Sequence, residues 1–163
     1  MAETLAPSAA GTETILRAST RSMRGHFEIR LDVKPASIPH IRGILRHHLG
    51  LWGYEDLALV AETGVTELLT NVHRHVESKM ATLLVQCVFD GICVTVSDLS
   101  QDRPVVQDPD PYTESGRGLR LLMAMVDDWS VAVTPTGKDV WFRLRCTATD
   151  EELGGDQDEA QNA

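Results

Sequence analysis

Three polar residues recur at intervals of four along one apolar segment: Glu67, Asn71 and His75. At helical geometry each step of four residues turns by only about 40°, so the three side chains would lie along one edge of a helix. A carboxylate there can accept a proton, and an amide oxygen suits Mg²⁺. Taken alone, the spacing favours rim residues that touch water, because helix stripes produce such patterns by chance.

A further acidic residue, Asp98, ends a strand-like run in which Val94 and Val96 share its face. An unpaired carboxylate in an apolar layer is costly, so Asp98 needs hydrogen-bond donors. An adenine amino group can supply one. The alternative is a capping acid for the turn at Leu99-Ser100, which is a common arrangement.

A glycine pair, in Gly116-Arg117-Gly118-Leu119, opens a predicted helix after a long loop. Glycines let the backbone approach a ligand closely, and a helix N-terminus offers free N–H groups to phosphate. A lone G-x-G is also typical of a flexible hinge. The glycine pair therefore indicates a nucleotide-binding site only in combination with the other motifs.

Hydrophobic periodicity predicts the elements that would position these groups. The predicted strands are 26–33, 81–89, 92–98, 129–133 and 138–145, and the predicted helices are 38–51, 56–77 with Asp56 as cap, and 116–126. Residues 99–115 hold three prolines and predict a functional lid or disorder. Strands adjacent in sequence favour antiparallel pairing, so we expect an α+β two-layer sandwich: a mixed, mostly antiparallel sheet with helices on one face.

Length and composition fit one domain, with 163 residues and a 42% hydrophobic fraction. We expect a flexible segment at 1–25, a folded domain at 26–146 and an acidic, disordered tail at 147–163. The net charge of −9 argues against nucleic-acid binding. The chain has no apolar run of membrane length and no secretory signal, so we expect a cytoplasmic protein.

Cysteines and histidines raise the question of a metal site. Cys87, Cys93 and Cys146 lie in apolar, strand-like runs and form no C-x-x-C, so we interpret them as buried, reduced thiols. The pairs His47-His48 and His73/His75 have no obvious further ligands in the sequence.

Taken together, the segments resemble the GHKL ATP-binding fold, and most closely its anti-sigma factor serine/threonine kinases. The resemblance covers roughly residues 26–145, with the motifs in the family's order and spacing. Glu67, Asn71 and Arg74-His75 resemble the N box, Asp98 and Pro104 the first glycine box, Glu114 to Leu119 the second, and Gly137 to Phe142 the final strand motif.

This resemblance implies ATP and Mg²⁺ as cofactors and a role for each matching residue. Glu67 would be the general base, Asn71 would hold Mg²⁺ and Asp98 would bind the adenine N6 amino group. The remaining cofactor-binding residues would be His75, Pro104, Ser115, Gly116, Arg117, Gly118 and Leu119, with Gly116 to Gly118 cradling the phosphates. The reaction would transfer the γ-phosphoryl group to a serine of an anti-sigma antagonist of the STAS type.

The resemblance also implies partners: the antagonist, a sigma factor that the chain sequesters, and a second copy in a homodimer. Two departures favour an alternative, a catalytically inactive nucleotide-binding module. No glycine follows Asp98 at the D-x-G position, and Asp139 replaces a hydroxyl residue near adenine. Gly64, inside the second predicted helix, would either admit a ligand or mark drift. A histidine kinase remnant is less favoured, because 1–25 holds no phospho-acceptor helix.

Overall fold

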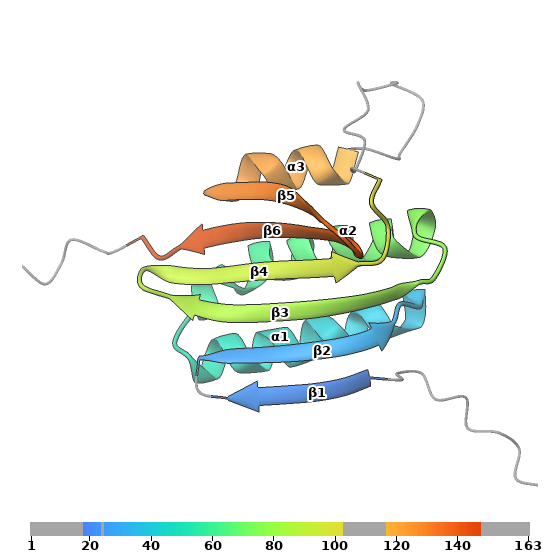
Figure 1. The fold of residues 1–163 in the computed structure, drawn as a ribbon. Coiled ribbons are helices and arrows are strands. Elements are labelled where there is room, and N and C mark those ends of the chain that lie inside the picture. The colour runs from blue at the N-terminus through green and yellow to red at the C-terminus, as the bar shows by residue number, and fades with distance from the viewer. Residues whose placement is uncertain (1–17, 24, 103–116, 148–163) are drawn as a thin grey trace, which may run out of the picture.

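The fold is a six-stranded sheet with helices packed on one face (Figure 1). The computed structural model describes residues 18–23, 25–102 and 117–147. The strands are β1 (Ala18–Met23), β2 (His26–Asp32), β3 (Met80–Val88), β4 (Gly91–Asp98), β5 (Asp128–Thr134) and β6 (Gly137–Arg145). Their order across the sheet is β1-β2-β3-β4-β6-β5.

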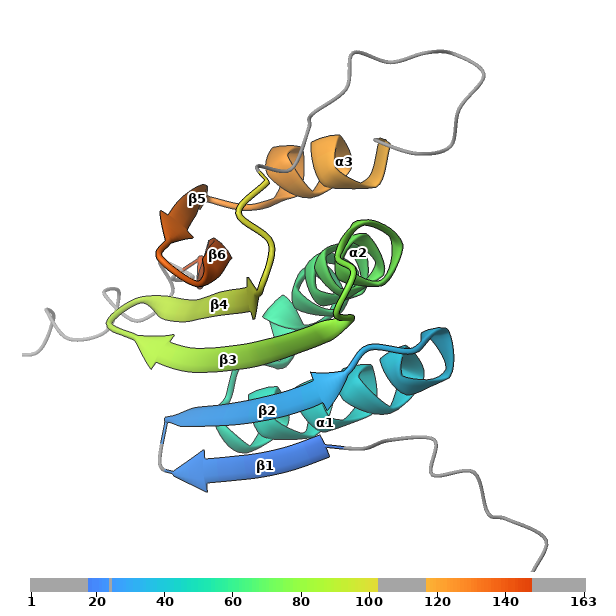
Figure 2. The ribbon, with the colours of Figure 1, turned by 45° about the vertical axis from the view of Figure 1, so that its right-hand side comes forward.

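Three helices complete the architecture: α1 (Ile38–Leu51), α2 (Ala58–His75) and α3 (Arg117–Met125). Short 3-10 turns, η1 (Pro35–Ser37) and η2 (Glu55–Leu57), precede α1 and α2. Figure 2 shows α1 and α2 side by side behind the sheet, with α3 beyond α2 near β5 and β6. This two-layer α+β sandwich confirms the predicted fold class.

The core lies between the helices and the sheet, and its residues follow the two expected periods. On β2, Phe27, Ile29 and Leu31 are fully buried at every second position. On α1, Ile41, Leu45 and Leu49 are fully buried at every fourth position. Burial of these alternating side chains fixes which face of each strand points to the helices.

Strand β1 was not expected, because residues 18–23 fall inside the segment predicted to be flexible. It pairs antiparallel with β2, from Ala18 opposite Leu31 to Met23 opposite His26. Backbone hydrogen bonds to a neighbouring strand form this element, and its sequence ASTRSM has no apolar alternation that would reveal it. The folded domain therefore includes residues 18–23, which precede its predicted start at residue 26.

Two other predicted details are wrong: the mixed sheet and the Asp56 cap. Every strand pairing among the described residues is antiparallel, so the sheet is not mixed in this part of the chain. Asp56 does not cap α2, because it lies in η2 and the cap residue is Leu57, which makes no side-chain cap bond. The predicted lid starts at Leu99, but its residues 103–115 lie outside the described ranges.

Glu62 is a buried acidic residue of α2. It is only 6% exposed. Its two carboxylate oxygens accept hydrogen bonds of 2.7 Å each from Nε and Nη2 of Arg46 on α1. The carboxylate thus links α1 to α2, an arrangement that a single-helix projection does not reveal.

Gly64 lets α2 lie close to its neighbours. A Cβ added at this position would lie 2.5 Å from Cζ of Phe142 on β6 and 2.8 Å from Cδ1 of Leu122 on α3. Core side chains therefore fill the space beside Gly64, so this glycine serves helix packing and does not admit a ligand. Among the helices of the described ranges, none is long and apolar enough to cross a membrane.

Candidate functional site

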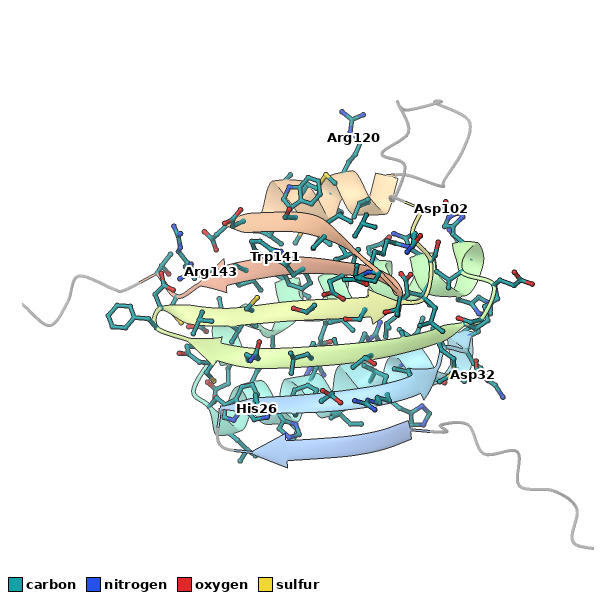
Figure 3. The ribbon with its side chains drawn as sticks, in the orientation of Figure 1. His26, Asp32, Asp102, Arg120, Trp141 and Arg143 are labelled. Atoms are coloured by element: carbon teal, nitrogen blue, oxygen red, sulfur yellow. The ribbon has the colours of Figure 1, made fainter. Side chains whose placement is uncertain are left out.

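Four chain segments meet at one edge of the molecule, which we call the site edge: the end of β4, the start of β6, the last turns of α2 and the first turn of α3 (Figure 1). The labelled Asp102, just beyond β4, marks this edge in Figure 3. The predicted site residues Glu67, Asn71, Asp98 and Gly118 all lie on these segments. The end of β4 lies beside the start of β6, because the two strands are antiparallel.

Asp98 is buried, as its strand position predicted, with only 2% of its side chain exposed. Its Oδ1 accepts two hydrogen bonds, one of 2.8 Å from the backbone N–H of Ser100 and one of 3.0 Å from Nζ of Lys138. The capping interpretation of this acid is therefore confirmed, and its contact with adenine stays a prediction. Asp98 caps the turn that follows β4, and its burial requires donors from the surrounding protein.

Lys138 is the site-edge residue that our sequence reasoning missed. It lies directly opposite Asp98 in the β4–β6 pairing, and only 8% of its side chain is exposed. Its Nζ also donates to the backbone oxygen of Ser100, at 3.3 Å. Strand alternation could have found it, because Lys138 shares its face with the buried residues Val140 and Phe142.

Asp139, by contrast, faces away from the site. It pairs with Ser97 on the open side of the sheet, one position out of phase with the buried pair Asp98 and Lys138. Figure 3 shows Trp141, which shares this phase, on the face that the helices leave open. Asp139 therefore adds no side-chain charge beside Asp98, and this argument for an inactive module loses its basis.

Glu67 contacts the second glycine motif across the gap between α2 and α3. A Cβ added to Gly118 would lie 1.8 Å from Oε2 and 2.2 Å from Cδ of Glu67. The carboxylate thus occupies space that only glycine leaves free at this position. The structure brings together a candidate base and a candidate phosphate-binding glycine that lie far apart in sequence.

Asn71 and His75 extend the same helix edge toward the end of α2. Asn71 lies one turn beyond Glu67 and is half-buried, so its amide is partly shielded from water. His75 is the last residue of α2 and is exposed, as either a rim residue or a cofactor-binding residue would be. Their predicted roles in cofactor binding stay predictions.

The second glycine motif is described only from Arg117 onward, where α3 begins. Leu119 is 7% exposed and belongs to the hydrophobic core, so its side chain serves packing and only its backbone could face a cofactor. Pro104, Ser115 and Gly116 lie outside the described residues.

The chain leaving β4 is held against the turn between β5 and β6. Nε2 of Gln101 donates to the backbone oxygens of Thr134, at 3.1 Å, and Pro135, at 2.9 Å. Beneath this contact, a Cβ on Gly137 would lie 1.8 Å from the backbone oxygen of Asp98. Glycine at 137 therefore permits the close approach of β6 to the end of β4.

The cysteines and histidines differ in burial and do not gather into a metal site in the described ranges. In the described ranges, no three His, Cys, Asp or Glu residues form a group that could hold a metal ion. Burial raises the pKa of the Cys87 and Cys93 thiols, which are half-buried. Cys146 follows β6 and is exposed, so the expectation of a buried thiol is wrong there.

The fold and the site edge together define an ATP-binding module of the GHKL type. A family model described as the histidine kinase-like ATPase domain matches residues 31–144. This match spans more than half of the chain, and the chain belongs to that family. A comparison with curated proteins finds no match.

Domains of this family bind ATP, usually with Mg²⁺, and the site-edge residues fit both groups. The Asp98 carboxylate is an acceptor for an amino group, and the free N–H groups in the first turn of α3 can donate to a phosphate. The amide oxygen of Asn71 is a hard oxygen ligand of the kind that Mg²⁺ prefers. The donor set therefore agrees with the family assignment.

Proposed function

We propose that this chain is an anti-sigma factor serine/threonine kinase. It transfers the γ-phosphoryl group of ATP to a serine of a STAS-type antagonist, and it also sequesters a sigma factor. The observation that carries the kinase proposal is the contact between the Glu67 carboxylate and Gly118 at the start of α3. A module that only binds nucleotide needs no base beside its phosphate-binding glycine.

In this proposal each residue of the site edge has a chemical task. Glu67 accepts the proton of the serine hydroxyl while that oxygen forms its bond to the γ-phosphorus. The bond from the γ-phosphorus to the β,γ-bridging oxygen breaks, and ADP leaves with its electron pair. Asn71 would hold Mg²⁺, which would balance the charge of the phosphates. Catalysis would thus be positioning and charge stabilisation.

The proposed partners set where the protein would act. A sigma factor and a STAS-type antagonist both regulate transcription in the cytoplasm, so we place the chain there. The acidic net charge of −9 fits protein partners better than nucleic acid. A homodimer, as in proteins that this chain resembles, is part of the same proposal.

A nucleotide-binding module without kinase activity is the second candidate. One observation favours it: Oδ1 of Asp98 already carries two donors, and 2% of the side chain is exposed. A site that nucleotide enters rarely would suit a sensor that regulates through protein contact. The two candidates differ in whether Glu67 has a chemical role.

The test is transfer of labelled phosphate from ATP to each STAS-domain protein encoded beside sigma-factor genes in the source genome. Glu67→Gln should lower transfer by about 10²–10⁴-fold, because an amide cannot act as base. Mg·ATP binding should persist in this variant. Glu77→Gln is the matched control, since Glu77 is exposed beyond the end of α2.

Two results would decide against the kinase. Wild-type protein that binds ATP and a sigma factor but phosphorylates no antagonist would leave the nucleotide-binding module as the function. Transfer by Glu67→Gln at the wild-type rate would mean that the base lies elsewhere.

A further inference from the structure

The Asp98–Lys138 pair is the most deeply buried ion pair in the described part of the chain. The exposed fractions of the two side chains are 2% and 8%, whereas each other ion pair has at least one partner that is 35% exposed or more. Burial of two charges is costly unless each is paired and hydrogen-bonded. Such a pair at the site edge therefore calls for an explanation in terms of what the site binds.

The geometry leaves the two oxygens of Asp98 unequal. Nζ of Lys138 and the N–H of Ser100 both donate to Oδ1, and among the described residues no donor is seen to reach Oδ2. Lys138 is itself fixed by its second bond, to the backbone oxygen of Ser100. The carboxylate is thus held in one orientation, with one oxygen saturated and the other left for a ligand.

We propose that Lys138 is a positioning residue that sets the base preference of the nucleotide site. Its hydrogen bond to Oδ1 fixes the orientation of the Asp98 carboxylate, which accepts hydrogen bonds and leaves Oδ2 for the base. A carboxylate favours a base that presents an amino group, as adenine does, over a base that presents a carbonyl, as hypoxanthine does. This inference rests on the proposed nucleotide site.

The role of Lys138 follows from what its removal would do to a buried acid. Without Nζ of Lys138, only the N–H of Ser100 would hold Oδ1, and the carboxylate could turn about its side-chain bonds. Oδ2 would no longer be held where the amino group of the base lies, so the site would lose its preference.

The experiment compares the affinities for Mg·ATP and Mg·ITP by calorimetry, because the two nucleotides differ at the group that Asp98 would meet. We expect wild-type protein to prefer ATP by at least about tenfold, the effect of one unmatched buried group. Lys138→Met should bring the ratio to within about threefold, while Lys138→Arg should retain most of the preference. Loss of packing alone would weaken the binding of both nucleotides and leave the ratio of their affinities unchanged.

The matched control is Arg143→Met, which removes an ion pair with Asp90 at the other end of the same strand. This variant should keep the wild-type ratio. If Lys138→Met does not fold, as judged by its melting curve, Lys138→Leu replaces it, because that side chain also carries no hydrogen-bond donor.

Each outcome separates the two proposals. No binding of either nucleotide by wild-type protein would reject the nucleotide site, and the inference with it. An ATP preference that persists in folded Lys138→Met, or in the variant that replaces it, would overturn the inference alone and leave the nucleotide site standing. Equal affinities for ATP and ITP in wild-type protein would also overturn it.

Discussion

Strand β6 carries an ion pair at each end, and the two pairs lie in different surroundings. At the site edge, Lys138 and Asp98 are almost wholly buried. At the other end, which we call the hairpin end because β3 turns into β4 there, Arg143 and Asp90 are 31% and 35% exposed. The hydrogen bond from Arg143 holds the pKa of Asp90 below its ordinary value.

The difference teaches which of the two pairs is tied to function. Water can replace a lost partner at the hairpin end, so that pair has little effect on stability and needs no ligand to explain it. At the site edge a lost partner leaves a charge without compensation. The two ends therefore make opposite predictions for similar substitutions.

The largest expected effect is on catalysis at the site edge. Gly118→Ala would place a Cβ where the Glu67 carboxylate lies, so the flexible carboxylate must move away from α3. We expect phosphoryl transfer to fall by about 10²–10⁴-fold, the usual contribution of a general base, with little change in melting temperature. Transfer assays on purified protein measure the loss.

The control for this substitution is Gly43→Ala on α1, because a Cβ added there meets nothing within 4 Å. That variant should transfer phosphate as the wild type does. Full activity of Gly118→Ala would show that the Glu67–Gly118 contact has no part in the reaction.

The next effect compares the two ion pairs directly. Asp98→Asn should destabilise the fold by about 3–5 kcal/mol, because the buried Lys138 loses its counter-charge. Asp90→Asn should shift the urea midpoint far less, since its partners Arg143 and Arg145 remain open to water. Urea unfolding of both variants measures the contrast, and equal losses would mean that burial does not distinguish the two ends.

The smallest effect concerns a glycine that faces core side chains instead of the site edge. Gly64→Ala should destabilise the fold by about 1–3 kcal/mol, because Phe142 is fully buried and cannot move aside. The usual gain from replacing a helical glycine by alanine is about 1 kcal/mol, and Gly43→Ala should show a gain of that sign. Thermal melts compare the two, and stabilisation by both substitutions would contradict the packing described for Gly64.

The sequence predicts much of this fold, because burial follows simple periods. Alternation located β2, β4 and β6, and four-residue spacing located α1 and the half-buried edge of α2 that holds Glu67 and Asn71. Strand β1 escaped prediction because its strand state comes from backbone pairing with β2. Glu62 escaped because its burial depends on Arg46 of another helix.

The site was predictable residue by residue but not as a set of contacts. Strand position alone indicated that Asp98 points inward and needs donors. That one donor is Lys138 depends on the register of β4 against β6, which no local pattern specifies. The contact of Glu67 with Gly118 likewise depends on how α3 packs against α2.

The central claim is that nucleotide binds at the site edge, and a titration of ¹⁵N-labelled protein with Mg·ATP tests it most directly. We predict that amide resonances of residues 67–75, 98–102, 117–119 and 137–138 shift, while those of residues 87–93 at the hairpin end do not. Shifts confined to the hairpin end, or no shifts at millimolar Mg·ATP with protein shown to be free of nucleotide, would contradict the account.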